Sequence, residues 1–249
     1  MNPLQADQVI ADLDVRQHYE FLDDRFSWAC KSVHNVLYKG EEKITETMNY
    51  IKKETHNISR SNPWFRRGLA ILEDLGQKFV TWQPETIKYE ATIIIDRLSC
   101  FMSKYIHHDQ HIKHEWSAYH LLPPPSLEQE RDTLQPDYVA YIDPISTMNF
   151  ELLTMEVKRS DKQTNKFEPD LVRLGKQLQT MLDKLIYAKV KEPVVAGLLI
   201  VGYEAIAYRM DLRHSGQYRL VEISRFEFPS KTSHILLLPD ILEKLRQIK

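Results

Sequence analysis

The chain has 249 residues and a net charge of −2, which excludes a general electrostatic attraction to nucleic acid, so any such binding depends on a local basic patch. Hydrophobic residues make up 43% of the sequence, but no apolar run is long enough to span a membrane, as expected for a globular protein without membrane attachment. Two cysteines, Cys30 and Cys100, and a polar N-terminal stretch without the features of a signal peptide predict an intracellular protein of the cytoplasm or nucleus with unpaired thiols.

Residues 1–80 predict an N-terminal helical extension. Apolar residues recur at helical spacing until Gly40, and a further helix is expected over 41–54. After a turn-forming stretch, another helix is expected over 64–80. This part carries no cluster of side chains that indicates chemistry, and we therefore expect it to pack against the main domain.

The main domain is expected to span residues 84–249 and to contain a central β-sheet. The apolar run 194–201 is typical of a strand buried on both faces. A long amphipathic helix separates it from the preceding strand, which allows the two strands to run parallel in a mixed sheet. The full order is a helix over 85–106, strands over 116–122, 138–142 and 151–158, a helix over 170–189, strands over 194–201, 205–212 and 218–228, and a last helix over 240–248. We therefore predict the α/β (α+β) class, with a central mixed β-sheet flanked by helices.

Charged residues lie at the adjoining ends of two of these strands. Asp137 follows Pro136 and begins one strand, while Glu156 and Lys158 share one face at the end of the next. A hairpin brings the three side chains to the same end of the sheet, where two carboxylates can hold a hard divalent cation. Carboxylates this close repel each other, so one of them should have a raised pKa.

Pro136-Asp137 and, 19 residues after Asp137, Glu156-Val157-Lys158 resemble the signature of the PD-(D/E)XK nuclease superfamily. The resemblance covers roughly residues 84–202 and implies a restriction-endonuclease-like fold. It implies a nuclease that hydrolyses phosphodiester bonds in nucleic acid, DNA rather than RNA, with Mg²⁺ or Mn²⁺ as cofactor. The metal ligands would be Asp137, Glu156 and the backbone carbonyl of Val157, and Lys158 would position or activate the attacking water.

The same resemblance implies two supporting residues. The helix before the first strand supplies an acid, for which Glu90 is the candidate and Glu85 and Asp96 are the alternatives. The helix after the third strand supplies a polar residue, and Gln177 matches this place best. Met181 stands where the RecB-like branch of the superfamily has tyrosine, so that branch is not assigned.

Basic residues near the motif predict contacts with the phosphate backbone: Arg159, Lys162, Lys166 and Lys176. Two other interpretations stay open. One is a catalytically inactive nuclease-fold module that binds nucleic acid or a protein partner, and the other is an interaction protein without a nucleic-acid role. The intact Asp137, Glu156 and Lys158 favour the enzyme, and the sequence leaves a homodimer open.

Overall fold

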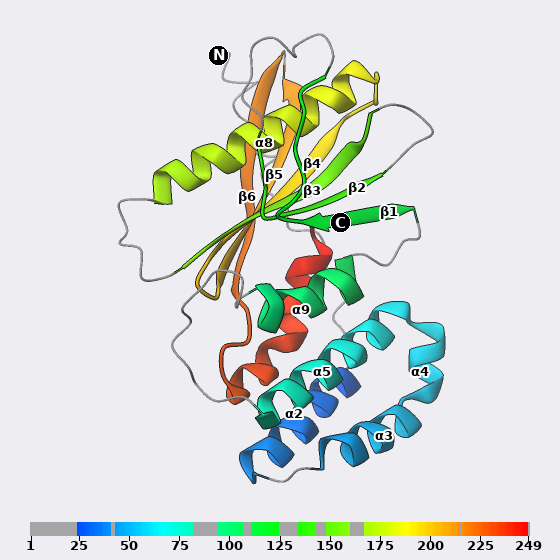
Figure 1. Ribbon diagram of the computed structural model, residues 1–249. Helices are drawn as coiled ribbons and strands as arrows, with labels where there is room; N and C mark the ends of the chain where they lie inside the picture. Colours follow the sequence, from blue (N-terminus) through cyan, green and yellow to red (C-terminus); the bar gives the residue numbers. More distant parts are fainter. Residues whose placement is uncertain are drawn as a thin grey trace, which may run out of the picture.

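The computed structural model describes residues 24–40, 43–81, 94–106, 111–124, 134–142, 148–159, 167–214 and 216–248. Figure 1 shows a twisted sheet with helices on both sides. Helix α8 lies across one face, and the other side holds α2, α3, α4, α5 and α9. The class is thus α+β with a mixed sheet flanked by helices, as predicted. None of the helices in the described ranges is both long and apolar enough for a membrane span.

In the part of the chain that the structure describes, the sheet has six strands in sequential order. Of these six described strands, β3 and β4 pair in parallel, and the other neighbouring pairs are antiparallel. The parallel pair follows from the long connection through α8, since a tight turn joins antiparallel strands only. The strands are β1 (Ile112–Trp116), β2 (Tyr138–Ile142), β3 (Phe150–Lys158), β4 (Val194–Val201), β5 (Glu204–His214) and β6 (Gln217–Glu227).

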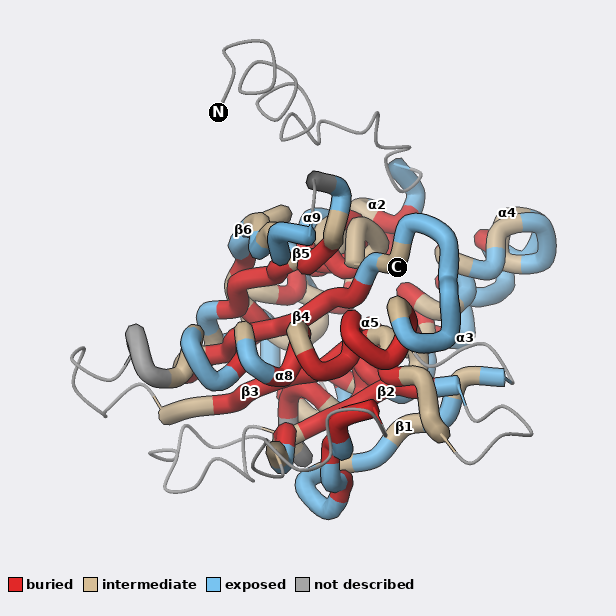
Figure 2. The backbone as a smooth tube through the Cα atoms, turned by 90° about the horizontal axis from the view of Figure 1, so that it is seen from above, coloured by how far each residue is buried: buried red, intermediate tan, exposed pale blue. Residues whose placement is uncertain are grey.

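Helix α8 (Phe167–Tyr187) packs closely on the sheet through its leucines. A Cβ added at Gly197 of β4 would lie 3.0 Å from Leu174 Cδ1 and 3.1 Å from Leu178 Cδ1, so glycine permits the close approach of the helix. In Figure 2, most residues of β3 and β4 are buried, whereas α8 has both buried and exposed residues. This packing fixes which side chains of α8 face the end of β3.

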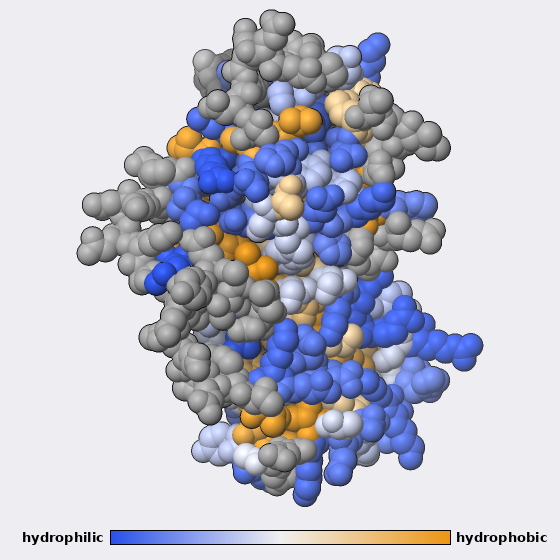
Figure 3. Space-filling view, in the orientation of Figure 1, coloured by the Kyte–Doolittle hydropathy of each residue, from blue (hydrophilic) through white to orange (hydrophobic). Residues whose placement is uncertain are grey.

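The helical layer shares one hydrophobic core with the other face of the sheet. Phe26 of α2 and Leu72 of α5 belong to the same buried cluster as Met155 of β3 and Leu198 of β4. Asn62 caps α5 by accepting hydrogen bonds from the Trp64 and Phe65 amides. The layer consists of α2 (Asp24–Tyr38), α3 (Ile44–Glu54), α4 (His56–Ser61), α5 (Pro63–Thr81), η1 (Ile94–Leu98), α7 (Ser99–Phe101), η2 (Met102–Ile106), η5 (Thr232–Leu237) and α9 (Leu238–Arg246). In the view of Figure 3, hydrophilic residues cover much of its outer surface.

The first strand lies earlier in the chain than the sequence suggests. A strand was expected over 116–122, whereas β1 ends at Trp116. Ser117 has a φ of +48°, which turns the chain out of the sheet. The residues of β1 alternate between partly buried and exposed, as in an edge strand with one solvated face. Its sequence, IKHEW, has few apolar residues and therefore does not predict a strand clearly.

Both cysteines are buried and unpaired, as expected. Burial raises the pKa of Cys100 to about 12 and raises the pKa of Cys30 as well. The two thiols are therefore core residues rather than reactive ones.

Candidate functional site

Asp137, Glu156 and Lys158 meet at one end of the sheet, as the strand assignment predicts. The amide of Asp137 donates to the Met155 carbonyl at 3.1 Å, which extends the β2–β3 pairing by one residue. Asp137 Oδ2 in turn accepts the amide N–H of Val157 at 2.7 Å. The carboxylate of Asp137 is therefore held directly over the end of β3, beside Glu156.

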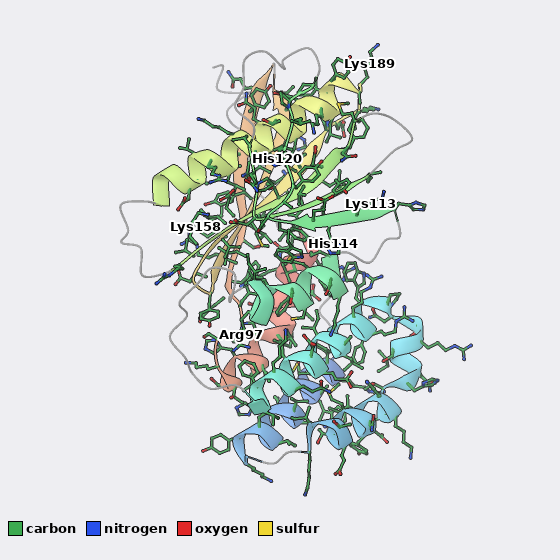
Figure 4. The ribbon with its side chains drawn as sticks, viewed as in Figure 1. Arg97, Lys113, His114, His120, Lys158 and Lys189 are labelled. Carbon is green, nitrogen blue, oxygen red and sulfur yellow. The ribbon has the colours of Figure 1, made fainter. Side chains whose placement is uncertain are left out.

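Among the described residues, three oxygens lie close to the ammonium of Lys158. Lys158 Nζ lies 3.0 Å from Glu156 Oε2, 3.0 Å from the Val157 carbonyl oxygen and 3.4 Å from Asp137 Oδ2. These oxygens belong to the three residues that the sequence assigns to a metal ion. Figure 4 shows Lys158 at the end of the sheet, between α8 and the helical layer. A monovalent cationic group thus lies where three oxygen donors converge.

The site is closed on one side and open on the other. The side chain of Glu156 has no exposed surface, whereas those of Lys158 and Asp137 are 17% and 26% exposed. A small ion or a phosphate group from solvent would meet Asp137 and Lys158 before Glu156. The carboxylate of Glu156 therefore lies at the buried end of the site.

Helix α8 fixes the orientation of Glu156. Gln177 Nε2 donates to Glu156 Oε1 at 2.5 Å, and Thr154 Oγ1 donates to Gln177 Oε1 at 3.0 Å. Arg173 Nε lies 3.2 Å from the same Glu156 oxygen. Gln177 is fully buried, so its carboxamide has no freedom to exchange these partners with water.

Sequence reasoning found Gln177 but missed Arg173. Arg173 lies four residues before Gln177, one helical turn away, so the two side chains share a face of α8. That spacing was the available signal. The arginine side chain is 45% exposed and also donates to the Gln135 carbonyl, so it spans from solvent to the buried carboxylate.

The pKa of Glu156 is raised, as two neighbouring carboxylates predict, but the main cause is different. Burial of the carboxylate is the largest cause, ahead of the charge of Asp137. The charge of Lys158 and the hydrogen bonds from Lys158 and Gln177 act in the opposite direction. Burial therefore makes the ionised form of Glu156 less favourable than that of an exposed glutamate.

The remaining predicted residues are not all placed. Glu90, its alternative Glu85, and the basic Lys162 and Lys166 lie outside the described residues, as does the side chain of Asp96. Arg159 follows the site directly and is half-buried, and Lys176 is exposed on α8 next to Gln177. Within the described ranges, no three His, Cys, Asp or Glu side chains gather in an arrangement that could hold a metal. Any metal there would rest on two carboxylates and backbone or water oxygens.

A second buried polar cluster lies under the other half of α8. Lys184 Nζ donates to Glu151 Oε1 at 2.6 Å, and the Tyr119 hydroxyl donates to the same oxygen at 2.5 Å. A β-bulge turns Glu151 toward α8: Tyr141 pairs with Glu151 and Ala140 with Leu153, so one extra residue of β3 stands between them. Gln177 and Lys184 are seven residues apart, two helical turns, and this spacing predicts that both lie on the same face of α8.

Comparison of the chain with protein-family models, with curated proteins and with solved structures finds no match.

Replacing Gln177 with leucine should raise the pKa of Glu156 further, because the hydrogen bond from Gln177 favours the ionised carboxylate. A raised carboxyl pKa makes stability fall as pH rises from the ordinary value near 4.5 to the folded-state pKa. In the Gln177→Leu variant this fall should continue to higher pH than in the wild type. Melting temperature recorded against pH in metal-free buffer measures the difference.

Thr180→Val is the matched control for this variant. Thr180 is also buried on α8, but its hydroxyl donates to the Lys176 carbonyl of its own helix. The control should keep the wild-type pH profile. If Gln177→Leu kept it too, the hydrogen bond to Glu156 would not influence the titration.

Proposed function

We propose that the chain is a metal-dependent nuclease that hydrolyses phosphodiester bonds in nucleic acid, DNA rather than RNA, in the manner of the PD-(D/E)XK superfamily. One observation carries the proposal: Asp137 Oδ2, Glu156 Oε2 and the Val157 carbonyl oxygen converge on a single cationic group. The strand pairing that produces this convergence, antiparallel β2–β3 followed by parallel β3–β4, supports the same assignment.

The chemistry of the donors fits a divalent cation. All three are hard oxygen donors, two of them carboxylates, which is what Mg²⁺ and Mn²⁺ prefer. Burial of Glu156 makes its negative charge costly in the absence of a cation, as the raised pKa reflects. Asp137, Glu156 and the Val157 carbonyl would hold the ion, which would polarise the scissile phosphate and lower the pKa of a bound water.

The side chains of the chain itself then have distinct tasks. Gln177 and Thr154 orient the carboxylate of Glu156, and the Val157 amide orients that of Asp137. Lys158, released from its three oxygens, is the group that positions the attacking water or stabilises charge on the phosphate. The side chain of Arg173 is 45% exposed and its guanidinium lies at Glu156, which suits binding of a phosphate that reaches the site.

A second candidate is an inactive nuclease-fold module that binds nucleic acid or a protein partner. Its supporting observation is that both carboxylates already have cationic partners, Lys158 for Asp137 and Glu156, and Arg173 for Glu156. Among the described residues, these two cations balance the charge of the two carboxylates without metal. The intact Lys158 and the unfavourable ionisation of Glu156 favour the enzyme.

Millimolar Mg²⁺ or Mn²⁺ should raise the melting temperature of the protein. An ion that binds only the folded state stabilises it by mass action, by about 2.7 kcal/mol at a concentration of about 100 times the Kd. The Glu151→Gln variant should respond as the wild type does, because Glu151 is paired with Lys184 away from the site. A melting temperature that responds in the Glu156→Gln variant as strongly as in the wild type would place the ion elsewhere.

The function is tested by incubating purified protein with supercoiled plasmid, single-stranded DNA and RNA, each with Mg²⁺, Mn²⁺ or EDTA. We expect cleavage of DNA with either metal and intact substrate with EDTA. Binding of a nucleic acid in EDTA without cleavage in either metal would replace the enzyme by the inactive module. Cleavage that persists in EDTA would refute metal dependence.

A further inference from the structure

The face of the sheet opposite α8 carries an apolar cavity that the proposed nuclease site does not use. Its volume is about 400 Å³, within the range of roughly 300–1,000 Å³ typical of small-molecule sites. Besides residues of the sheet, the cavity is lined by Ile106 of η2 and by Gln247 and Ile248, which follow α9. The walls are mainly aliphatic: Ile112, Ala140, Val194, Ala196, Ile223 and Ile248.

One charged side chain enters this apolar wall. Arg209 of β5 lines the cavity, and among the described residues its Nε is buried without a hydrogen-bond partner. The guanidinium touches Asp211 only at its edge, with Arg209 Nη2 3.5 Å from Asp211 Oδ2. A buried guanidinium nitrogen without an acceptor is unfavourable, and an acceptor placed in the cavity would satisfy it.

The carboxylate of Asp211 is shared between Arg209 and Arg219. Asp211 is buried and is held by Arg219 through two hydrogen bonds, of 2.9 Å to Oδ1 and 2.8 Å to Oδ2. Two guanidinium groups therefore face one carboxylate. The carboxamide of Gln247 adds a second polar group, whose Oε1 is also buried without a partner among the described residues.

We propose that this cavity binds a medium-chain carboxylate, such as a saturated fatty acid of about ten carbons, a size suited to a cavity of this class. The alkyl chain lies against the aliphatic wall, where its methylenes are removed from water. The carboxylate accepts a hydrogen bond from Arg209 Nε, which has no partner among the described residues. Val194, 45% exposed, lies where the cavity reaches solvent. The proposal is independent of the nuclease function, because the two sites use opposite faces of the sheet.

Calorimetric titration of the full chain with decanoate, decanol and decylamine tests the charge and the cavity together. We expect decanoate to bind with at least about tenfold higher affinity than decanol, the value of a charged hydrogen-bonded pair, and decylamine to bind least. Arg209→Gln should lower the affinity for decanoate to that for decanol. Arg213→Gln, an exposed position on the same strand, should leave it unchanged.

A second variant decides the matter if Arg209→Gln does not fold. Val194→Asp places a negative charge at a half-exposed position of the wall, so it should weaken decanoate about tenfold while weakening decanol less. Equal affinities for the three probes would show that the cavity binds alkyl chains regardless of their head group, and this would overturn the proposal. So would the absence of saturable decanoate binding, or decanoate binding that neither variant changes.

Discussion

Alanine in place of Lys158 is expected to abolish metal-dependent cleavage, with a fall in rate of about 10²–10⁴-fold or more, the contribution of one general acid–base group. Affinity for nucleic acid should fall less than about tenfold, because phosphate contacts are spread over many cations. The affinity for Mn²⁺ should be retained or increased, because the ammonium no longer competes for Asp137 Oδ2 and Glu156 Oε2. Cleavage rates, nucleic-acid binding and Mn²⁺ titration of one preparation measure all three.

Lys176→Ala is the control for this variant, since Lys176 is an exposed lysine on the helix that flanks the site. It should keep cleavage within about threefold of the wild type, as expected for one of many phosphate contacts. Cleavage by Lys158→Ala at the rate of the Lys176→Ala control would remove Lys158 from the mechanism. Loss of Mn²⁺ binding along with cleavage would indicate that Lys158 is needed to build the site rather than to act in it.

The Glu156→Gln variant is expected to lose cleavage to a similar extent and, in metal-free buffer at neutral pH, to melt at a higher temperature than the wild type. Burial penalises the ionised carboxylate, and glutamine removes that charge while keeping the shape of the side chain. The increase should be on the order of a few degrees, as an effect near 1 kcal/mol gives for a chain of this size. Melting curves with and without metal test it.

The pH dependence of this gain has a definite sign. A carboxyl with a raised folded-state pKa contributes no penalty below its ordinary value near 4.5, and the full penalty above its folded-state pKa. The difference between Glu156→Gln and wild type should therefore shrink as the pH falls and vanish below about 4.5. A variant less stable than the wild type at neutral pH would mean that the ion pairs with Lys158 and Arg173 outweigh the cost of burial.

The elements that position the site could be predicted from the sequence because their patterns are local. The apolar run 194–201 predicts a buried strand, and the leucine stripe of α8 predicts an amphipathic helix. The spacing of Asp137 and Glu156 places both residues at one end of the sheet. The parallel pairing of β3 with β4 follows from the length of the helical connection.

What the sequence did not predict depends on contacts between distant residues. The bulge that turns Glu151 toward Lys184 arises from the pairing of β3 with β2. One extra residue in β3 moves the side chains on one side of the bulge to the opposite face of the sheet. Arg173 looks like an ordinary surface residue of an amphipathic helix until the end of β3 is placed beneath it. The raised pKa of Glu156 likewise depends mainly on burial, which the spacing of charges along a strand does not reveal.

A divalent cation in the proposed site would take the place now held by the Lys158 ammonium. Crystals of the protein grown with Mn²⁺ test it directly, because the anomalous signal of manganese locates the ion without reference to activity. We expect a peak within coordination distance of Asp137 and Glu156, with the Lys158 ammonium moved away from their oxygens. An anomalous map without a peak at saturating Mn²⁺, and Lys158 still bonded to Glu156 and Asp137, would contradict it.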